Sequence, residues 1–432
     1  MEIANIFFQV AIFVLFFSIS FPFLVSKFDN NLNYLDQLVF NIIIQINLIL
    51  FLSFLNLSLK TILIVYFIYL SICVLFQLKN IIKIKLILKK DNYFYLFLLI
   101  ICLVLCLDIS YSLTLGWDAQ KFWIPKALNF YNNETIDNLS NVPNPQYPFL
   151  GSLLWATFWK ISFFPEEYTG RLVYVFLYCV SLASLTETLK LSSTIKIIFF
   201  TILILLSYNY IRFDGHQDIL IFCLISIGAK TLYTIISDNQ KISLYQTILL
   251  ILICNALIWT KQEGTVYAFI IIFTLFFFSK ISLYKRIVFL GLVILLFSAR
   301  IFIYKFYNLE VSLNSCCWSD LSLNALIEKF TFDRIITIIK FFLFIFLKNS
   351  FFLLGLVFLI ISFFSNNILK KDMYIYFFYL MSYGFIFSAY ITSELDLIFM
   401  LKSGGLDRLI FSSSPLYILI VTRYINAQNL KI

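Results

Sequence analysis

The sequence has few charged residues, and this shortage is its most informative property. Only 13% of its 432 residues are Asp, Glu, Lys or Arg, whereas 62% are hydrophobic. Soluble domains carry roughly a quarter of their residues as charges, so this chain has too little polar surface to fold in water. The composition is that of an integral membrane protein.

The sequence also lacks the patterns of a zinc site. It has one histidine, His216, and no two cysteines in a CxxC spacing. Metal centres built from Cys and His need several such ligands close together. The net charge of +9 does not predict a nucleic-acid partner, because the Lys and Arg residues lie in short loops between apolar runs. Basic residues in such loops orient membrane helices.

What the chain has instead is long apolar runs. They are continuous and do not alternate with polar residues, which favours helices over a transmembrane barrel. We therefore expect an all-α fold, a polytopic transmembrane helical protein with about 11–13 spans. The candidate spans are residues 6–25, 37–56, 61–78, 93–115, 168–189, 195–211, 218–236, 245–259, 264–279, 287–304, 350–364, 373–391 and 409–425.

Two further apolar segments are not expected to cross. Residues 149–164 follow two prolines and predict a re-entrant or interfacial helix. Residues 335–348 are short and basic, and they predict a helix on the outer surface. No soluble domain or internal repeat is visible, so we expect one membrane domain over residues 1–432. Its parts are N-terminal spans (1–92), a span with the first outer loop (93–165), central spans (166–304), an outer loop with its interfacial helix (305–349) and C-terminal spans (350–432).

The basic loops predict which ends of the spans face outward. Clusters of Lys and Arg at 79–90, 280–286 and 370–371 mark the cytoplasmic side. The outer segments are then residues 116–148, 212–218, 260–264, 305–334 and 392–408. These hold the unusual polar residues of the chain, which predicts one polar site on the outer face.

The first outer loop begins with a carboxylate at the membrane surface. Asp118 is flanked by Trp117 and Trp123, and tryptophans at this position can simply anchor the chain at the interface. A carboxylate beside a span loses solvation, which strengthens its basicity and suits a general base for a hydroxyl group. Lys126 and Tyr147 belong to the same loop, which closes with a stiff proline-rich turn.

Two short gaps between later spans also hold charges. Asp214, His216 and Asp218 occur together before one span, where Asp218 can cap the helix. These carboxylates could also contact sugar hydroxyls, or a hard cation through water. Lys261 and Glu263 lie in the other gap, where charges near lipid must be paired and a mutual salt bridge is the simplest explanation.

The last outer segment ends with an arginine that opposes the positive-inside trend. Arg408 opens the final candidate span. A guanidinium binds phosphate through paired N–H donors, and a lipid phosphate at the interface is a suitable ligand. The alternative is an ion pair with Asp407, Asp396 or Glu394.

The order of these motifs resembles a known family. The pattern WDA-x-x-x-W-x-x-KA at 117–127, the Tyr-Pro at 147–148, G-x-x-D at 215–218, TK-x-EG at 260–264 and DRL at 407–409 occur in turn. Together they look like GT-C superfamily glycosyltransferases, and most like the family 39-like bacterial proteins related to protein mannosyltransferases and aminoarabinose transferases. The chain differs in having about three spans before the acidic loop and one acidic motif in it.

The resemblance implies a reaction. The donor would be a polyprenyl-phosphate-linked sugar, and the acceptor a hydroxyl on a glycan, lipid or protein. The transfer would invert the anomeric carbon, with Asp118 as the base, at the periplasmic face of a bacterial inner membrane. Arg408 or Lys261 could stabilise the leaving phosphate without a metal, or Asp118 and Asp214 could hold Mg²⁺ or Mn²⁺. The expected substrate-binding residues are Trp117, Trp123, Lys126, Tyr147, Asp214, His216, Asp218, Lys261, Glu263, Asp396, Asp407 and Arg408.

Two other functions remain open at this point. A transporter or flippase of a lipid-linked glycan would have charges in mid-span and broken helices related by repeats. Asp108 and Glu187 lie near span ends and do not favour it. A polysaccharide polymerase or ligase would have a large outer loop rich in Arg or His, whereas residues 305–334 carry only Lys305, Lys329 and Arg334.

Overall fold

The computed structural model is helical throughout the part of the chain that it describes. That part comprises residues 2–19, 33–81, 92–208, 213–237, 242–309, 323–364, 369–393, 397–402 and 405–429. No β-strand occurs within these ranges. The expectation of an all-α membrane protein is confirmed at this level.

The helices vary widely in length. In chain order they are α1 (Glu2–Ser18), α3 (Tyr34–Phe54), α4 (Leu59–Ile81), α5 (Asn92–Ser112), the π-helical turn η1 (Ala119–Trp123), α6 (Ile124–Tyr131), the 3₁₀ turn η2 (Asp137–Asn141), α7 (Leu150–Ile161), α8 (Tyr168–Thr186), α9 (Ser193–Ser207), α10 (Asp218–Ser237), α11 (Leu244–Thr260), α12 (Gln262–Phe278), α13 (Leu283–Phe306), α14 (Leu323–Lys329), α15 (Phe332–Lys348), α16 (Ser350–Phe364), α17 (Leu369–Thr392), α18 (Leu397–Lys402), α19 (Gly405–Ser413) and α20 (Pro415–Asn429).

Among the described residues, fewer helices than the thirteen candidates are long enough to cross a membrane. Seven meet the length and composition of a full span, or up to eight if the bent pair α15–α16 is one span. Four more apolar helices, α1, α9, α11 and α12, have 10–17 residues. At about 1.5 Å per residue they fall short of a bilayer core of about 30 Å. The final candidate span is not one helix, because α19 ends at Ser413 and α20 begins at Pro415.

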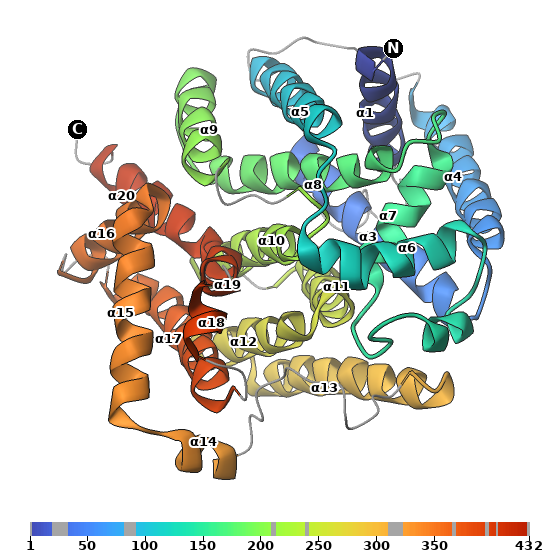
Figure 1. Cartoon of the computed structure of the whole chain (residues 1–432). Helices are drawn as coiled ribbons and strands as arrows, with labels where there is room; N and C mark the ends of the chain where they lie inside the picture. Colours follow the sequence, from blue (N-terminus) through green and yellow to red (C-terminus); the bar gives the residue numbers. More distant parts are fainter. Residues whose placement is uncertain are drawn as a thin grey trace.

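The central helices lie side by side. In Figure 1, α8, α10, α12 and α13 follow one another from the upper to the lower part of the view, and each packs against the next. All of α8 is buried inside the protein, whereas only 22% of the apolar window of α13 is. This gradient from a buried centre to an exposed edge is that of a helical bundle whose outer helices face lipid.

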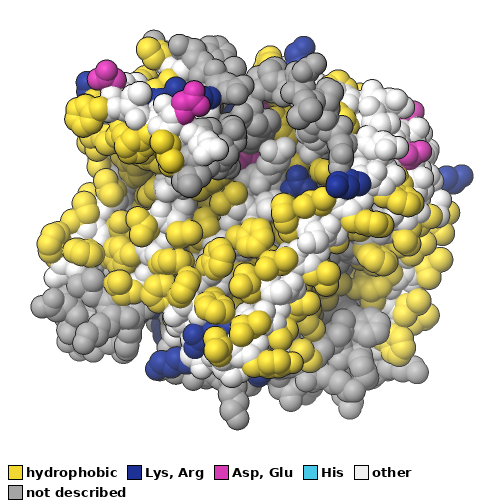
Figure 2. All heavy atoms as spheres, turned by 90° about the horizontal axis from the view of Figure 1, so that it is seen from below, with side chains coloured by type: hydrophobic (Ala, Val, Ile, Leu, Met, Phe, Trp, Pro, Cys, Tyr) yellow, Lys and Arg dark blue, Asp and Glu magenta, His cyan; other side chains and the backbone are white. Residues whose placement is uncertain are grey.

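The outer surface is apolar enough for that role. Figure 2 shows a face with a broad expanse of hydrophobic side chains, and with Lys and Arg toward its margins. On α13, large side chains such as Leu295 and Phe302 are 62% and 68% exposed. Exposed apolar area of this extent marks contact with lipid or with another protein.

Polar side chains join the helices inside the bundle. Gln45 on α3 donates to the Phe16 carbonyl of α1 at 2.8 Å and accepts from the Tyr66 hydroxyl of α4 at 2.6 Å. Asn47 accepts from Asn255 of α11 at 2.7 Å. Without a hydrophobic drive between helices in lipid, such interhelical hydrogen bonds help to fix their arrangement.

The two segments predicted not to cross form helices of different kinds. The first contains α7, whose twelve residues would reach only about 18 Å. Its residues 150–159 are all buried within the protein, so it is an internal helix and not an exposed interfacial one. The second contains α15, which meets α16 at an angle of 102°. A surface helix that turns into a crossing helix has this geometry.

Two glycines on different helices allow a matched test of this packing. A Cβ on Gly355 would lie 2.4 Å from Cγ of the buried Tyr417 ring, whereas nothing lies within 4 Å of one on Gly291. Gly355→Ala should destabilise the protein by about 1–3 kcal/mol through overpacking of α16 against α20. Gly291→Ala should be neutral or stabilising by up to about 1 kcal/mol. Equal shifts of the apparent unfolding midpoint in detergent would show that α16 and α20 do not pack in this way.

Candidate active site

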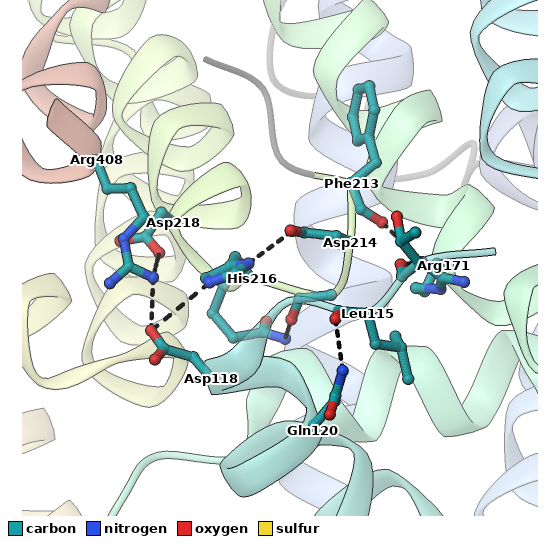
Figure 3. Close-up of polar contacts among 12 residues, drawn as sticks. Leu115, Asp118, Gln120, Arg171, Phe213, Asp214, His216, Asp218 and Arg408 are labelled. Carbon is teal, nitrogen blue, oxygen red and sulfur yellow. Dashed lines mark hydrogen bonds and ion pairs between the residues drawn. The ribbon is translucent and has the colours of Figure 1, made fainter. Parts of the chain in front are cut away.

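Seven charged or titratable side chains from four distant segments form one connected group, the site cluster. Its members are Asp118, Asp214, His216, Asp218, Lys261, Glu263 and Arg408, joined by contacts of 2.5–3.8 Å. Figure 3 shows Asp118, Asp214, His216, Asp218 and Arg408 converging from separate elements. All seven come from the segments that the sequence predicts to share one face. The structure therefore brings these segments together in one cluster.

Asp118 reaches the cluster through an irregular connection after α5. The chain leaves that helix at Ser112, and Asp118 directly precedes the π-helical turn η1. Single π turns are frequent at functional sites because they redirect neighbouring side chains. The Gly116 N–H donates to the Asp214 carbonyl at 2.9 Å, and a Cβ on Gly116 would lie 1.9 Å from Cε1 of His216. Glycine is needed here because the imidazole ring rests against the backbone.

The turn before α10 positions His216. Gly215 has φ of +92°, a conformation that glycine adopts without strain. Gln217 is fully buried, and its amide donates to the Tyr174 hydroxyl of α8 at 3.1 Å. A Cβ on Gly151 of α7 would collide with the Gln217 side chain. The turn is thus locked against α7 and α8.

Arg408 lies between two carboxylates. Its Nη1 is 2.5 Å from Oδ2 of Asp118 and 3.8 Å from Oδ2 of Asp218. Burial works against the charge of Arg408, but Asp218 and Asp118 outweigh it and hold its pKa above the ordinary value. Of the three carboxylates expected as alternative partners, Glu394 and Asp396 lie outside the described residues. Asp407 instead accepts from the Arg408 backbone N–H at 3.1 Å.

His216 lies between Asp214 and Asp118. Its Nδ1 is 2.6 Å from Oδ1 of Asp214, and its Nε2 is 3.7 Å from Oδ2 of Asp118. The ring is only 4% exposed. The imidazole thus lies between the two carboxylates of the predicted Asp118–Asp214 metal site. The described residues contain no group of three His, Cys, Asp or Glu that could hold a metal ion.

Lys261 joins the other half of the cluster. It lies in the break between α11 and α12, where its Nζ is 3.0 Å from Oδ1 of Asp218 and 3.2 Å from Oε1 of Glu263. Burial opposes its charge, but the two carboxylates outweigh burial and raise the pKa of Lys261. The predicted Lys261–Glu263 pair is confirmed. Oδ2 of Asp218 and Oε2 of Glu263 are buried without a hydrogen bond to any described residue.

Three predicted substrate-binding residues lie beneath the loop and not in the cluster. Trp123 and Tyr147 are buried with ring centroids 5.8 Å apart. Lys126 is fully buried, and its Nζ donates to the Tyr147 carbonyl at 2.6 Å. Burial, followed by the nearby charge of Arg300, holds the pKa of Lys126 well below its ordinary value. For Trp123 and Lys126, proximity to Asp118 in sequence was misleading, because η1 and α6 turn these two side chains into the core.

The remaining predicted residues have separate positions. Trp117 is 65% exposed beside Asp118, and its ring packs edge-on against Phe122. Asp396 lies outside the described residues, as does Arg212 before the α10 turn. Asp108 accepts from the Tyr208 hydroxyl at 2.6 Å, between α5 and α9. Trp117 is thus the one predicted aromatic residue left accessible next to the cluster.

A buried arginine that the sequence analysis did not select holds two of the site segments. Arg171 on α8 is 1% exposed and makes a two-pronged ion pair with Glu167, at 2.9 and 3.1 Å. Its Nη1 also donates to the carbonyls of Thr114 and Phe213, at 2.8 and 3.3 Å. These precede Asp118 and Asp214 respectively. The one available signal was an arginine inside an apolar run, which is costly unless it is paired.

Arg300 has the same role for the third segment. It is a buried residue of α13, and its Nη1 donates to the Ile258 carbonyl and to Oγ1 of Thr265, both at 2.9 Å. These two groups flank the break that carries Lys261. Arg171 and Arg300 thus stabilise the backbone on either side of the cluster.

Replacement of Arg171 tests this clamp. Arg171→Lys keeps the charge but cannot reproduce the forked contacts, and buried carbonyls lose their donors. We expect the protein to lose about 2–4 kcal/mol of stability, measured as the apparent unfolding midpoint in detergent. Arg286→Lys is the control, because Arg286 also donates to two carbonyls, those of Ile281 and Phe276, but does not contact the site segments. A drop for Arg171→Lys no larger than that of the control would contradict the clamp.

Known proteins give no further guide to the role of this site. Comparison with protein-family models, with curated proteins and with solved structures finds no match. The function must therefore be argued from the cluster and its place at the helix ends.

Proposed function

We propose that the protein is a glycosyltransferase that moves a sugar from a polyprenyl-phosphate donor to a hydroxyl acceptor. The observation that supports this is the ion pair between Asp118 and Arg408, which sets a carboxylate and a cation side by side in a largely buried cluster. Such a transfer needs one group that takes the acceptor's proton and another that stabilises the leaving phosphate. The cluster contains both.

Asp118 is the proposed base. Its Oδ2 contacts Arg408 and faces His216, while its Oδ1 has no hydrogen bond to any described residue. The side chain is 21% exposed, so a hydroxyl group can approach it. Attack on the face of the sugar opposite the phosphate inverts the anomeric carbon. An acceptor placed beside Oδ1 would lose its proton to Asp118 as the new glycosidic bond forms.

Arg408 is the proposed phosphate ligand. An arginine forms paired, charge-assisted hydrogen bonds with phosphate oxygens. In the structure its Nη1 is occupied by Asp118. A donor phosphate would compete for this guanidinium and release Asp118 for its role as the base. Lys261, held by Asp218 and Glu263, adds a second cation next to this place.

The position of the cluster favours a lipid-borne donor. It lies at the start of α10, in the break between α11 and α12, and on α19, where helices of the bundle end. The outer helices expose large apolar side chains such as Phe302. A polyprenyl tail can remain in the bilayer while its phosphate reaches the helix ends. On the positive-inside rule this face is the outer one, which is periplasmic if the membrane is a bacterial inner membrane.

Asp118→Asn is the direct test of the base. Purified protein in nanodiscs would be supplied with a panel of radiolabelled polyprenyl-phosphate sugars, and transfer to water, glycan or lipid acceptors would be measured. Asp118→Asn should lower kcat by about 10²–10⁴, because an amide cannot take the proton.

Asp137→Asn is the matched control. Asp137 is an exposed carboxylate of the same loop and lies outside the cluster. Full activity of Asp118→Asn, with wild-type transfer measurable, would remove Asp118 from the mechanism. No transfer by the wild type from any polyprenyl-phosphate sugar would contradict the proposed function.

Arg408→Lys tests the phosphate ligand. Lysine keeps the charge but loses the forked donors, so we expect a higher KM for the donor together with a fall in kcat of about tenfold or more. The same variant should bind an unreactive polyprenyl phosphate more weakly in a competition assay. Unchanged donor KM and competition would assign Arg408 to a purely structural ion pair.

A further inference from the structure

The contacts of His216 indicate a role other than substrate binding. Its Nδ1 is 2.6 Å from Oδ1 of Asp214, and its ring is pressed against Gly116. An ionised carboxylate can only accept a hydrogen bond, so Nδ1 must donate to it. In the neutral ring the proton then resides on Nδ1, and Nε2 is left as an acceptor.

That acceptor faces Asp118. Nε2 and Oδ2 of Asp118 are 3.7 Å apart, which is longer than a hydrogen bond. Two acceptors with no proton between them stay apart, and one proton placed on either atom would draw them together. Catalytic hydrogen bonds are often this long in the free enzyme and shorten when substrate binds. The proton that the reaction releases could therefore be held between Nε2 of His216 and Oδ2 of Asp118.

We propose that His216, oriented by Asp214, is a catalytic residue that takes from Asp118 the proton of the acceptor hydroxyl. This inference rests on the proposed transferase function. The acceptor O–H bond breaks as its oxygen bonds to the anomeric carbon, and the bond from that carbon to the phosphate oxygen breaks. The phosphate leaves with the electron pair of that bond. The proton passes to Oδ1 of Asp118. Once the phosphate has drawn Arg408 away, rotation of the carboxyl group brings this proton to Nε2, which leaves an imidazolium stabilised by Asp214.

The surrounding charges support the direction of this transfer. The groups facing the ring are Asp214 on one side and Asp118 on the other, with Asp218 two residues further on at the start of α10. Asp214 is the carboxylate within hydrogen-bond distance of the ring, and it can stabilise the imidazolium that forms once Nε2 has taken the proton. Arg408 lies beyond Asp118 and would be engaged by the phosphate. The pathway therefore runs away from the cation and toward negative charge.

A spectroscopic test does not depend on activity. His216 is the only histidine in the chain, so ¹⁵N-histidine labelling gives a single imidazole to observe by NMR. We expect a neutral ring protonated on Nδ1 at the pH of the assay, and a loss of this preference in Asp214→Asn. A ring protonated on Nε2, or an imidazolium in the resting protein, would overturn the proposal because Nε2 could not accept a proton.

Kinetics separate this role from substrate binding. His216→Ala should lower kcat by about 10² with the donor KM changed by no more than about twofold, and added imidazole should restore part of the rate. Asp214→Asn should lower kcat less, because the ring stays in place. An unchanged kcat with a raised KM would make His216 a substrate contact. If the wild type transfers sugar while His216→Ala keeps its kcat, the inference fails and the proposed function stands. If the wild type transfers none, both fall.

Discussion

The ion pair between Asp118 and Arg408 is the contact on which the rest of the site depends. It joins residues 290 positions apart, one from the first large loop and one from α19. Arg408 also extends toward Asp218, which holds Lys261. A cluster of this kind costs desolvation energy for every charge that is buried, and the cost is offset only when each charge has partners of opposite sign. Removal of one member would leave its neighbours as uncompensated charges.

The backbone that carries the cluster is stabilised from outside it. Arg171 holds the carbonyls before Asp118 and Asp214, and Arg300 holds both sides of the Lys261 break. Both arginines are buried, and their several N–H donors satisfy two carbonyls in the case of Arg171 and a carbonyl and a hydroxyl in the case of Arg300. Irregular backbone at membrane depth is tolerated only where protein groups satisfy it. The two clamps therefore make the short breaks at the helix ends possible, and those breaks expose the charged side chains to one another.

The spacing of charges along the chain was a good guide to the members of the cluster. It was a poor guide to the residues around the cluster that hold its backbone in place. The gaps between apolar runs correctly predicted that His216, Lys261 and Arg408 would lie in one cluster, because charges near lipid must be paired with other charges. The same reasoning failed for Lys126, which follows Asp118 closely in sequence but is buried beneath the loop. The reason is the π-helical turn, which changes the direction of side chains without any clear sequence signal. Arg171 was overlooked because it lies within a helix and not in a gap between apolar runs.

The sequence by itself determined that this is a helical membrane protein, and it predicted that its unusual charges lie in the gaps between apolar runs. Composition and the length of apolar runs are local properties, and lipid allows few ways to satisfy the backbone. Only the tertiary structure decided how those charges pair. His216 lies between Asp214 and Asp118, and Arg408 lies between Asp118 and Asp218. Both arrangements depend on how α8, α10, α12 and α19 pack. Packing between helices in lipid is set by shape and by a few polar contacts, which apolar periodicity does not encode.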